Sequence, residues 1–237
     1  MHGNEPLVSV VVPVRDDAAA LAHVLAGLPP VQDVELIVSA TAEDEEALTG
    51  LRETRPDVRW VSGPAGRGTQ LNSGAAEAHG RWLWFVHADS DVPPVWRDEF
   101  ARLDGEDGVV WGSFAFGLIS AAWQARAIEW AVGWRVRLFG LPYGDQGIFV
   151  RRAVFERMGG FAPLPLMEDV EFVRRLHREG RAAHLTVTLP TAARRWERQG
   201  WWRRSAANLL TLGLYAAGVS PERLARRYNS GSTQSSR

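Results

Sequence analysis

Two carboxylates that lie close together in the chain could bind a metal ion. Asp89 and Asp91 belong to the run FVHADSDVPP (residues 85–94), in which apolar residues typical of a buried strand come first. Two carboxylates at the carboxyl end of a strand can hold a divalent cation through hard oxygen ligands. Such a cation would bridge a diphosphate and offset the charge on a departing phosphate. The alternative is an ordinary polar loop, but the position after a strand favours the metal site.

A second acidic pair, Glu168 and Asp169, follows a proline-containing apolar loop in the run LPLMEDVEFVRRLHREG (residues 164–180). The pattern predicts a helix that starts near Glu168 and stops at Gly180. Acids in a first helical turn are stabilised by the positive end of the helix dipole. Helix-start chemistry alone therefore explains the pair, and the rest of the chain must show whether it also has a chemical role.

A glycine-rich turn in the run GPAGRGTQLNSGAAEAHG (residues 63–80) leads into a predicted helix start. A helix N-terminus can receive anionic groups, and Arg67 could add a forked contact to a phosphate. A flexible loop is the alternative. The usual phosphate motifs are absent, because PVRDDAAA follows the first predicted strand in place of G-x-G-x-x-G, and a chain without lysine has no P-loop. A dehydrogenase is therefore disfavoured.

The elements that position these residues alternate along the first part of the chain. Strands are predicted at residues 7–14, 34–39, 58–63 and 81–88, with helices at residues 17–26, 44–55 and 69–78 between them. This alternation predicts parallel strands with helices on both faces of the sheet. Ligands in such sheets bind beyond the carboxyl ends of the strands, which is where the acidic and glycine-rich segments lie.

The second part of the chain is less regular. Strands are predicted at residues 109–118 and 147–150, and helices at residues 119–138 and 201–217. Trp123, Ala127, Trp130, Trp134 and Leu138 recur at steps of three or four residues in the first of these helices and form an apolar stripe. We expect this stripe to face the core; a membrane interface or an apolar acceptor is the alternative. No stretch is long and apolar enough to predict a transmembrane helix, and residues 229–237 read as a disordered polar tail.

Composition narrows the class of protein. The chain has 237 residues, of which 46% are hydrophobic, and this suits one large α/β domain. There is no cysteine, which excludes disulfides, thiolate metal sites and a cysteine nucleophile and fits a reducing compartment. The start, MHGNEPLVSVVVPV, has no basic region and contains Pro13, so it reads as a strand and not as a signal peptide. We therefore expect a cytoplasmic protein.

Charge is unevenly distributed although the net charge is −1. Residues 1–150 hold 11 Arg and 21 acids, whereas residues 151–237 hold 16 Arg and 7 acids. The basic part predicts an anionic partner, either a phosphorylated substrate or an acidic membrane surface such as the inner membrane face. Nucleic acid is not expected, because the arginines form no dense tract and no recognition motif accompanies them.

Taken together, several motifs resemble family 2 glycosyltransferases with the GT-A fold, and in particular the small bacterial arsenosugar-biosynthesis subgroup. They are VSVVVPVRDD, GRGTQLNSGAAEAHGRWLWFVHADSDVPP, PYGDQGIFVRRAVFERMGGFAPLPLMEDVEFVRRL and ARRWERQGWW. The resemblance runs from Leu7 to Tyr228. It implies a three-layer α/β/α sandwich with a mostly parallel, Rossmann-like sheet. We expect a single domain at residues 1–228, with a nucleotide-sugar-binding half at 7–92 and an acceptor half at 93–228.

The resemblance also implies a function and the residues that perform it. It implies transfer of a sugar from a nucleotide-sugar donor to an acceptor hydroxyl, with a Mg or Mn ion and with inversion at the anomeric carbon. Asp89 matches the metal-binding aspartate, and Asp169 matches the catalytic base, with Glu168 in support. The other matched positions are Pro13, Asp17, Arg67 and Asn72 for the nucleotide, and Arg195 and Trp196 for the acceptor. Asp145 and Gln146 come just before a predicted strand, and we expect them to line the acceptor or sugar pocket.

Three positions depart from the family pattern. His87 stands where most relatives have the first aspartate of Asp-x-Asp, so one metal ligand is moved to Asp91 or lost. Ser39 stands where most have an aspartate that contacts the base, which predicts weaker uridine selectivity unless Asp44 substitutes. Ala192 replaces the glutamine of the acceptor motif of processive relatives, which argues against processive synthesis.

Two other functional classes stay open. The changes at His87 and Ser39 would also suit a nucleotide-sugar-binding protein with weakened catalysis. The Trp-rich and Arg-rich helices would suit a peripheral membrane or interaction module. The sequence does not identify the sugar or the acceptor, which could be lipid-like or a small molecule.

Overall fold

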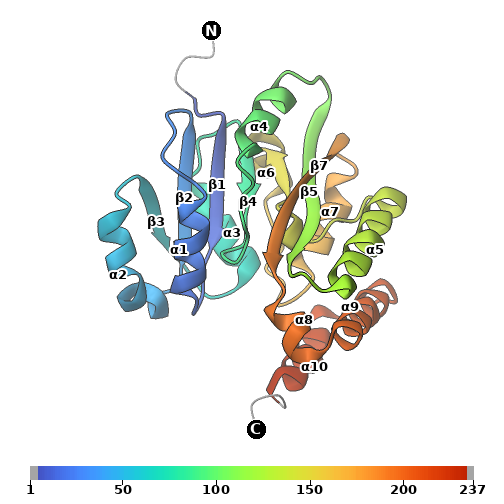
Figure 1. The fold of residues 1–237 in the computed structure, drawn as a ribbon. Coiled ribbons are helices and arrows are strands. Elements are labelled where there is room, and N and C mark those ends of the chain that lie inside the picture. Colours follow the sequence, from blue (N-terminus) through green and yellow to red (C-terminus); the bar gives the residue numbers. More distant parts are fainter. Residues whose placement is uncertain (1–4, 234–237) are drawn as a thin grey trace.

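The computed structural model describes residues 5–233, and its centre is a sheet of seven strands in the order β3-β2-β1-β4-β6-β5-β7 (Figure 1). The strands are β1 (Val8–Pro13), β2 (Val34–Ala40), β3 (Val58–Ser62), β4 (Trp82–Phe85), β5 (Val109–Ile119), β6 (Phe149–Arg151) and β7 (Arg181–Ala192). All pairings are parallel except those of β6, which runs antiparallel between β4 and β5. The prediction of a mostly parallel sheet is confirmed.

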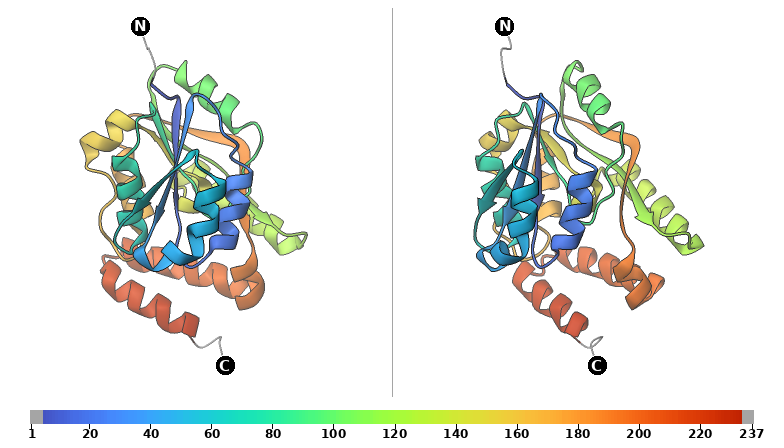
Figure 2. Two further views of the ribbon diagram at one scale, coloured as in Figure 1. Left: turned by 90° about the vertical axis from the view of Figure 1, so that its left-hand side faces the viewer. Right: turned by 60° about the vertical axis from the view of Figure 1, so that its left-hand side comes forward.

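Helices cover both faces of this sheet. One face is covered by α1 (Ala18–Ala26), α2 (Glu45–Thr54) and α4 (Trp96–Asp104). The opposite face is covered by α3 (Arg67–Ala76), α6 (Arg152–Met158) and α7 (Glu168–Leu176). The result is a three-layer α/β/α sandwich, and Figure 2 shows its layers from the side. The strands and helices predicted for the first part of the chain are present, with ends that differ by a few residues.

The β1 strand shows why the central strands form. Val10 and Val12 pack into the cluster beneath α1 and α4, whereas Val11 packs into the cluster beneath α3 and α7. Because successive side chains of a strand point to opposite faces, an uninterrupted apolar run is buried on both sides. This burial fixes β1 in the middle of the sheet and brings its end, near Pro13, to the edge where the other parallel strands end.

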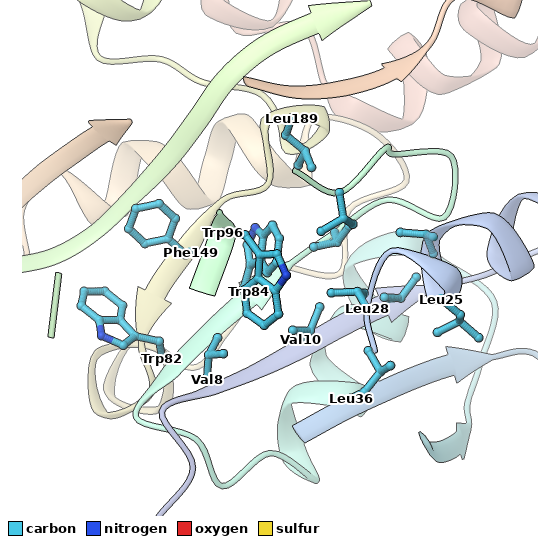
Figure 3. Packing of buried hydrophobic residues seen from close by; sticks show 14 of the residues in the cluster. Val8, Val10, Leu25, Leu28, Leu36, Trp82, Trp84, Trp96, Phe149 and Leu189 are labelled. Atoms are coloured by element: carbon cyan, nitrogen blue, oxygen red, sulfur yellow. The ribbon is translucent and has the colours of Figure 1, made fainter. Parts of the chain in front are cut away.

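Aromatic residues join the two parts of the chain in one core. Trp82 and Trp84 of β4 pack against Phe149 of β6 and Phe114 of β5, and all four side chains are fully buried. Figure 3 shows Trp82, Trp84 and Phe149 within this core. The ring centroids of Trp84 and Phe114 lie 4.9 Å apart in a stacked arrangement. Aromatic pairs of this kind add about 0.5–1.5 kcal/mol to the free energy gained from burial.

The β7 strand was not predicted from the sequence. Its run RAAHLTVTLPTA alternates buried with exposed positions only in its second half, and Pro190 interrupts the usual pattern of a central strand. As the last strand in the sheet order, β7 pairs with β5 along one side and on the other makes an isolated bridge between Thr191 and Ser90, so a proline is tolerated there. The pairing also requires Gly112, because a Cβ there would lie 1.9 Å from the Ala183 carbonyl oxygen.

Four helices gather at the end of the molecule where β5 and β7 stop (Figure 1). They are α5 (Trp123–Phe139), α8 (Arg194–Gln199), α9 (Trp201–Ala216) and α10 (Pro221–Thr233). The expectation that the Trp stripe of α5 faces the core is wrong, since Trp130 is 70% exposed. Ala125 and Ile128, on the opposite side of the helix, are the residues that α5 buries. Periodicity identified an apolar stripe, but Ala125 and Ile128 are the side chains that pack against the rest of the protein.

Helix α10 extends beyond Asn229, the residue at which we expected a disordered tail to begin. The remaining tail positions, residues 234–237, lie outside the described residues. Across residues 5–233, none of the helices combines the length and the apolar character needed to span a bilayer.

Candidate active site

A cavity of about 500 Å³ lies at the carboxyl ends of β1 and β4. Its walls come from the first turns of α3 and α7, the loop after β4, the segment before β6, the end of β7, and α8, α9 and α10. This volume is in the range that binds small ligands. Of the residues named from the sequence, those that line the cavity are Pro13, Asp17, Arg67, Asp89, Asp145, Glu168, Asp169, Arg195 and Trp196.

Arg67 lines this cavity and contacts two other residues of its wall. It begins α3, its guanidinium contacts the His87 ring, and its Nε is 3.6 Å from Glu168 Oε1. Gly144 passes so close that an added Cβ would lie 2.1 Å from Arg67 Nη2, so a side chain at this position would displace the Arg67 guanidinium. Burial raises the pKa of the Glu168 carboxyl, and the Arg67 charge acts in the opposite direction. Arg67 thus ties the α3 and α7 helix starts together.

His87 connects Arg67 to Asp89. Its Nε2 accepts the contact from Arg67, and its Nδ1 is 3.8 Å from Asp89 Oδ1. Burial, followed by the charges of Arg67 and Arg195, holds the pKa of the His87 imidazole well below its usual value, so the ring is neutral at pH 7. Because Arg67 uses the Nε2 lone pair, this nitrogen is not free to bind a metal ion.

Asp89 has a carboxylate that faces the cavity. Thr191 Oγ1 donates a hydrogen bond of 3.2 Å to Asp89 Oδ1. Asp91 does not line the cavity; its carboxylate instead lies 3.6 Å from His23 Nε2 of α1. The structure therefore separates the two aspartates that the sequence placed together, because neighbouring side chains in this loop point in different directions.

The fit of a metal ion rests on Asp89. In the described part of the chain, no three Asp, Glu or His side chains cluster closely enough to hold a metal ion. Magnesium, however, is commonly bound by one or two carboxylates together with substrate phosphates. A single cavity-facing carboxylate fits an ion of this kind, which binds together with a diphosphate.

Asp169 is held at the start of α7 by backbone contacts. The Gly144 N–H donates a hydrogen bond of 2.8 Å to Asp169 Oδ2, and the Val170 N–H donates one of 2.8 Å to Oδ1. The preceding residue, Met167, has a left-handed backbone with φ of 66°. Such a conformation costs a non-glycine residue about 1 kcal/mol or more, and strain of this type is concentrated at functional sites. The turn directs the Asp169 carboxylate into the cavity.

Asp145 is the most perturbed acid of the cavity. It belongs to the short 3-10 helix η2 (Gly144–Gln146), and its Oδ1 is buried without a hydrogen-bond partner. Burial raises the pKa of the Asp145 carboxyl from 3.8 to about 6, although the Arg135 charge opposes this effect. A buried, unpaired carboxylate oxygen beside a cavity is unfavourable until a ligand or an ion reaches it.

Asp17 links the start of α1 to the start of α8. Its Oδ1 accepts a hydrogen bond from the Ala20 N–H and so caps α1, while its Oδ2 lies 3.4 Å from Arg194 Nη2 of α8. Pro13 and Trp196 line the cavity near these contacts. The C-terminal helices therefore close over the side of the cavity that the first strand forms.

Three residues predicted to touch ligands have other roles in the structure. Ser39 is fully buried beneath α3 and does not line the cavity. Asn72 exchanges two hydrogen bonds of 2.8 Å with the backbone of Phe161. Gln146 accepts hydrogen bonds from Arg135 and from the Tyr143 N–H. Asn72 and Gln146 thus hold loops around the cavity in place, whereas the Ser39 hydroxyl is buried without a hydrogen-bond partner among the described residues.

Asp44 does not take the place of the missing aspartate at Ser39. Its Oδ2 accepts hydrogen bonds from the N–H and the hydroxyl of Thr41, and its Oδ1 accepts one from the Asp16 N–H. Together with the hydrogen bonds from Ser9 and His79 that hold Glu35, these contacts use polar side chains to fix the loops after β1 and around β2.

Sequence reasoning missed several residues of the cavity wall. Gln70 is buried, and its Nε2 donates to the carbonyl oxygens of Val14 and Ser39. Tyr143 lies under the Arg135 guanidinium at 3.6 Å from the ring centroid. The residues contributed by α9 and α10 are Arg204, Asn208, Thr211 and Tyr228. Polar residues recur at i, i+4 and i+7 on α9, and this spacing was the one available signal for a wall helix.

Solved glycosyltransferase structures share this fold. The mannosyltransferase PcManGT from Pyrobaculum calidifontis, in complex with GDP-Man and Mn2+, is 19% identical over 93% of this chain and 67% of that chain, with a TM-score of 0.65. S. aureus TarS 1-349 is 14% identical over 92% of this chain and 68% of that chain, with a TM-score of 0.62. TarS 1-349 has also been solved in complex with UDP-GlcNAc.

A third structure is glucosyl-3-phosphoglycerate synthase from Mycobacterium tuberculosis in complex with Mn2+, UDP and phosphoglyceric acid. It is 21% identical over 79% of this chain and 69% of that chain, with a TM-score of 0.55. No protein-family model and no curated protein matches the sequence. At these identities the similarity establishes the fold, which is that of the GT-A glycosyltransferases.

Proposed function

We propose that this protein is an inverting, metal-dependent glycosyltransferase of family 2 that moves a sugar from a nucleotide-sugar donor to an acceptor hydroxyl. The observation that carries the proposal is that Asp89 and Asp169 line one cavity. Asp89 is suited to binding a metal ion together with the donor diphosphate, and Asp169 is suited to accepting the proton of the acceptor hydroxyl. All three comparison proteins are glycosyltransferases, and their complexes contain GDP-Man with Mn2+, UDP-GlcNAc, or UDP with Mn2+.

On the donor side, Asp89 would hold a Mg or Mn ion together with the diphosphate. The ion supplies charge that offsets the negative charge on the departing nucleotide. The His87 ring lies between Arg67 and Asp89 and contacts the Arg67 guanidinium. This planar group is suited to binding a phosphate. Pro13 and Asp17 border the nucleotide, on the side where β1 ends.

On the acceptor side, Asp169 would take the proton from the attacking hydroxyl. Its two backbone hydrogen bonds fix the carboxylate, so it needs no rearrangement before the proton moves. Glu168 is buried and acts as a support that pairs with Arg67. Asp145 and Arg195 border the remaining space, where the sugar or the acceptor would bind.

The motif resemblance supports membership of the bacterial arsenosugar-biosynthesis subgroup, and we propose this assignment on the sequence alone. Ala192 lines the cavity where processive relatives have a glutamine. A small residue there removes a polar contact to a growing chain, which supports a single transfer per donor. The acceptor proposed here is a hydroxyl on a lipid-like or small molecule.

The test is a screen of nucleotide sugars in which metal-dependent thermal stabilisation is measured first and donor hydrolysis second. A ligand at 100 times its Kd stabilises a protein by about 2.7 kcal/mol, which shifts the melting temperature by several degrees. We expect one donor to stabilise the protein only when Mn or Mg is present. If no nucleotide sugar stabilises the protein with either ion, the proposal is wrong.

A second candidate is a nucleotide-sugar-binding protein that has lost catalysis. It is favoured by His87, which replaces a family aspartate and whose Nε2 is occupied by Arg67. This candidate predicts the same donor-dependent stabilisation but no release of nucleoside diphosphate. Hydrolysis that is lost in Asp169→Asn would decide for the enzyme, because contamination by another hydrolase would survive the substitution.

A further inference from the structure

The helices at the C-terminal end of the sheet carry an apolar surface that the described residues leave uncovered. We call it the Trp–Leu face; it consists of Trp123, Trp130, Trp134 and Leu138 of α5, and Trp202, Leu209 and Leu210 of α9. The exposed fractions of these side chains run from 43% for Trp134 to 70% for Trp130. Three tryptophans on one exposed helix face are unusual for a surface that meets only water.

The Trp–Leu face is continuous across the two helices. The ring centroids of Trp123 and Trp202 lie 5.7 Å apart, and those of Trp130 and Trp134 lie 6.1 Å apart. Figures 1 and 2 show α5 and α9 next to each other at the same end of the molecule. On each helix the opposite side is occupied, by Ala125 and Ile128 of α5 against the core and by Asn208 and Thr211 of α9 against the cavity.

The two helices that carry this face, and α8 beside them, are basic, and two of their arginines, Arg137 and Arg203, are exposed. The helices α5, α8 and α9 contain eight arginines and two glutamates. The arginines are Arg126, Arg135, Arg137, Arg194, Arg195, Arg198, Arg203 and Arg204. Arg137 lies beside the face, 5.7 Å from the Trp134 ring centroid. One of the glutamates, Glu129, is already paired with Arg126 and with the Leu118 N–H.

We propose that the Trp–Leu face docks the protein on the surface of an anionic lipid bilayer. Tryptophan is favoured at the membrane interface, where its ring is half buried and its N–H stays wet. Arginines around an apolar face attract anionic headgroups, at about 1 kcal/mol each, so the two features act together. The helices would lie in the plane of the interface without crossing it, which fits their length and composition.

A second copy of this chain fits the surface less well. A twofold dimer buries the same patch on both subunits, so it would bring the arginines of one copy against those of the other. Like charges across an interface cost several kcal/mol, and the face has too few acids to balance them. An anionic bilayer removes this repulsion, and it is therefore the occupant that the observations favour.

Docking would also place the cavity close to the bilayer. Leu209 and Leu210 lie on one side of α9, and Asn208 and Thr211 line the cavity from the other. The wall between the lipid and the cavity is therefore one helix thick. This proposal does not depend on glycosyl transfer, since the contact is made by residues outside the proposed catalytic set.

The test is co-sedimentation of the full chain with vesicles of phosphatidylcholine, with and without phosphatidylglycerol. We expect binding to the anionic vesicles that weakens in high salt. The double variants Trp130→Ser with Leu138→Ser, and Arg137→Glu with Arg203→Glu, should each weaken this binding by about tenfold or more. These side chains are exposed, so the melting temperature of each variant should stay close to that of the wild type.

Matched controls change similar residues elsewhere. Val95→Ser removes an apolar side chain that is 48% exposed, and Arg157→Glu with Arg181→Glu reverses two exposed arginines on other elements. Both controls should bind vesicles like the wild type. The proposal fails if the wild type does not sediment with anionic vesicles, or if the controls lose as much binding as the face variants. It also fails if light scattering shows a dimer that Trp130→Ser with Leu138→Ser separates.

Discussion

The cavity brings acidic side chains and arginines into a small space in which each charge depends on its neighbours. Arg67 reaches Glu168 directly and reaches Asp89 through the neutral His87 ring. Asp169 is fixed by backbone donors and Asp145 has a buried, unpaired oxygen. Acids in such different environments can have different roles, since hydrogen bonds favour a carboxylate and burial without partners favours its protonated form.

Asp169→Asn should lower the rate of sugar transfer by about a hundredfold or more while donor affinity changes only a few fold. The amide oxygen can still accept the Gly144 hydrogen bond across to η2, although the hydrogen bond from the adjacent Val170 N–H is lost, and the amide cannot take a proton. Single-turnover kinetics and donor titration on the same preparations measure the two effects. Near-normal turnover in this variant would leave the acidic pair as simple helix-start residues.

Asp145→Asn should stabilise the ligand-free protein above pH 6. The pKa of Asp145 is raised from 3.8 to about 6, so between these values the unfolded chain loses its proton first and the fold loses stability as pH rises. Above pH 6 the loss is complete and amounts to at most about 3 kcal/mol. Urea unfolding at pH 4 and pH 7.5 checks this: the variant should match the wild type at the lower pH and exceed it at the higher.

Asp89→Ala should abolish the metal dependence of nucleoside diphosphate binding, whereas Asp91→Ala should leave it nearly unchanged. Only Asp89 lines the cavity, and Asp91 lies beside His23 on α1. Calorimetric titration with Mn, and again with a chelator, measures the difference. If both variants lose the metal dependence equally, Asp91 is also a metal ligand. If the wild type binds nucleoside diphosphate equally well with the chelator, no metal is used.

At the scale of elements, the cavity depends on loops that side chains attach to helices. Asn72 of α3 attaches the loop at Phe161, and Gln146 attaches η2 to α5 through Arg135. The β7 strand brings Thr191 and the start of α8 to the same place. These contacts join segments far apart in the sequence, so changing one of them should affect the stability of the fold before it affects a ligand.

Asn72→Ala should destabilise the protein by about 2–3 kcal/mol, because it removes two hydrogen bonds and leaves the Phe161 backbone groups without partners. The affinity for the donor should fall little when the titration is made well below the melting temperature of the variant, where the protein is still folded. Urea unfolding combined with donor titration distinguishes this role from direct nucleotide contact. A large loss of affinity at unchanged stability would restore the role implied by the family resemblance.

At the scale of the whole molecule, the two halves share one core. Trp82 and Trp84 of the first half pack against Phe114 and Phe149 of the second, and β6 covers the side of β4 that β1 leaves open. The charge asymmetry also acts at this scale. The acidic first half holds one side of the cavity, and the basic C-terminal helices close it and carry the Trp–Leu face.

A fragment of residues 1–92 should therefore fail to fold cooperatively. Separation would expose both buried tryptophans of β4, and fully burying each large side chain contributes about 1.5–3 kcal/mol or more. Thermal unfolding followed by circular dichroism, together with amide dispersion in NMR spectra, tests the fragment. A cooperative transition would show that the donor half is an independent domain.

The sequence alone determined the layers of the fold and the elements that carry the chemistry. A strand in the middle of a parallel sheet is buried on both faces, so an uninterrupted apolar run such as β1 predicts a central strand. Ends of parallel strands meet at one edge, so the glycine-rich turn and Asp89 could be expected to meet. The family resemblance alone added the pair at Glu168, and all of these segments line one cavity in the structure.

Tertiary structure decided which side chains face that cavity. Asp91, Ser39, Asn72 and Gln146 carry suitable groups, yet none of them lines the cavity, because the backbone at each position and the elements packed around it, and not the residue type, set the direction of a side chain. The Trp stripe of α5 faces away from the core for a related reason, which also lies in the tertiary structure. Periodicity shows that a helix has an apolar face, but which face is buried depends on the shape of the sheet it packs against, and that is assembled from strands distant in the chain.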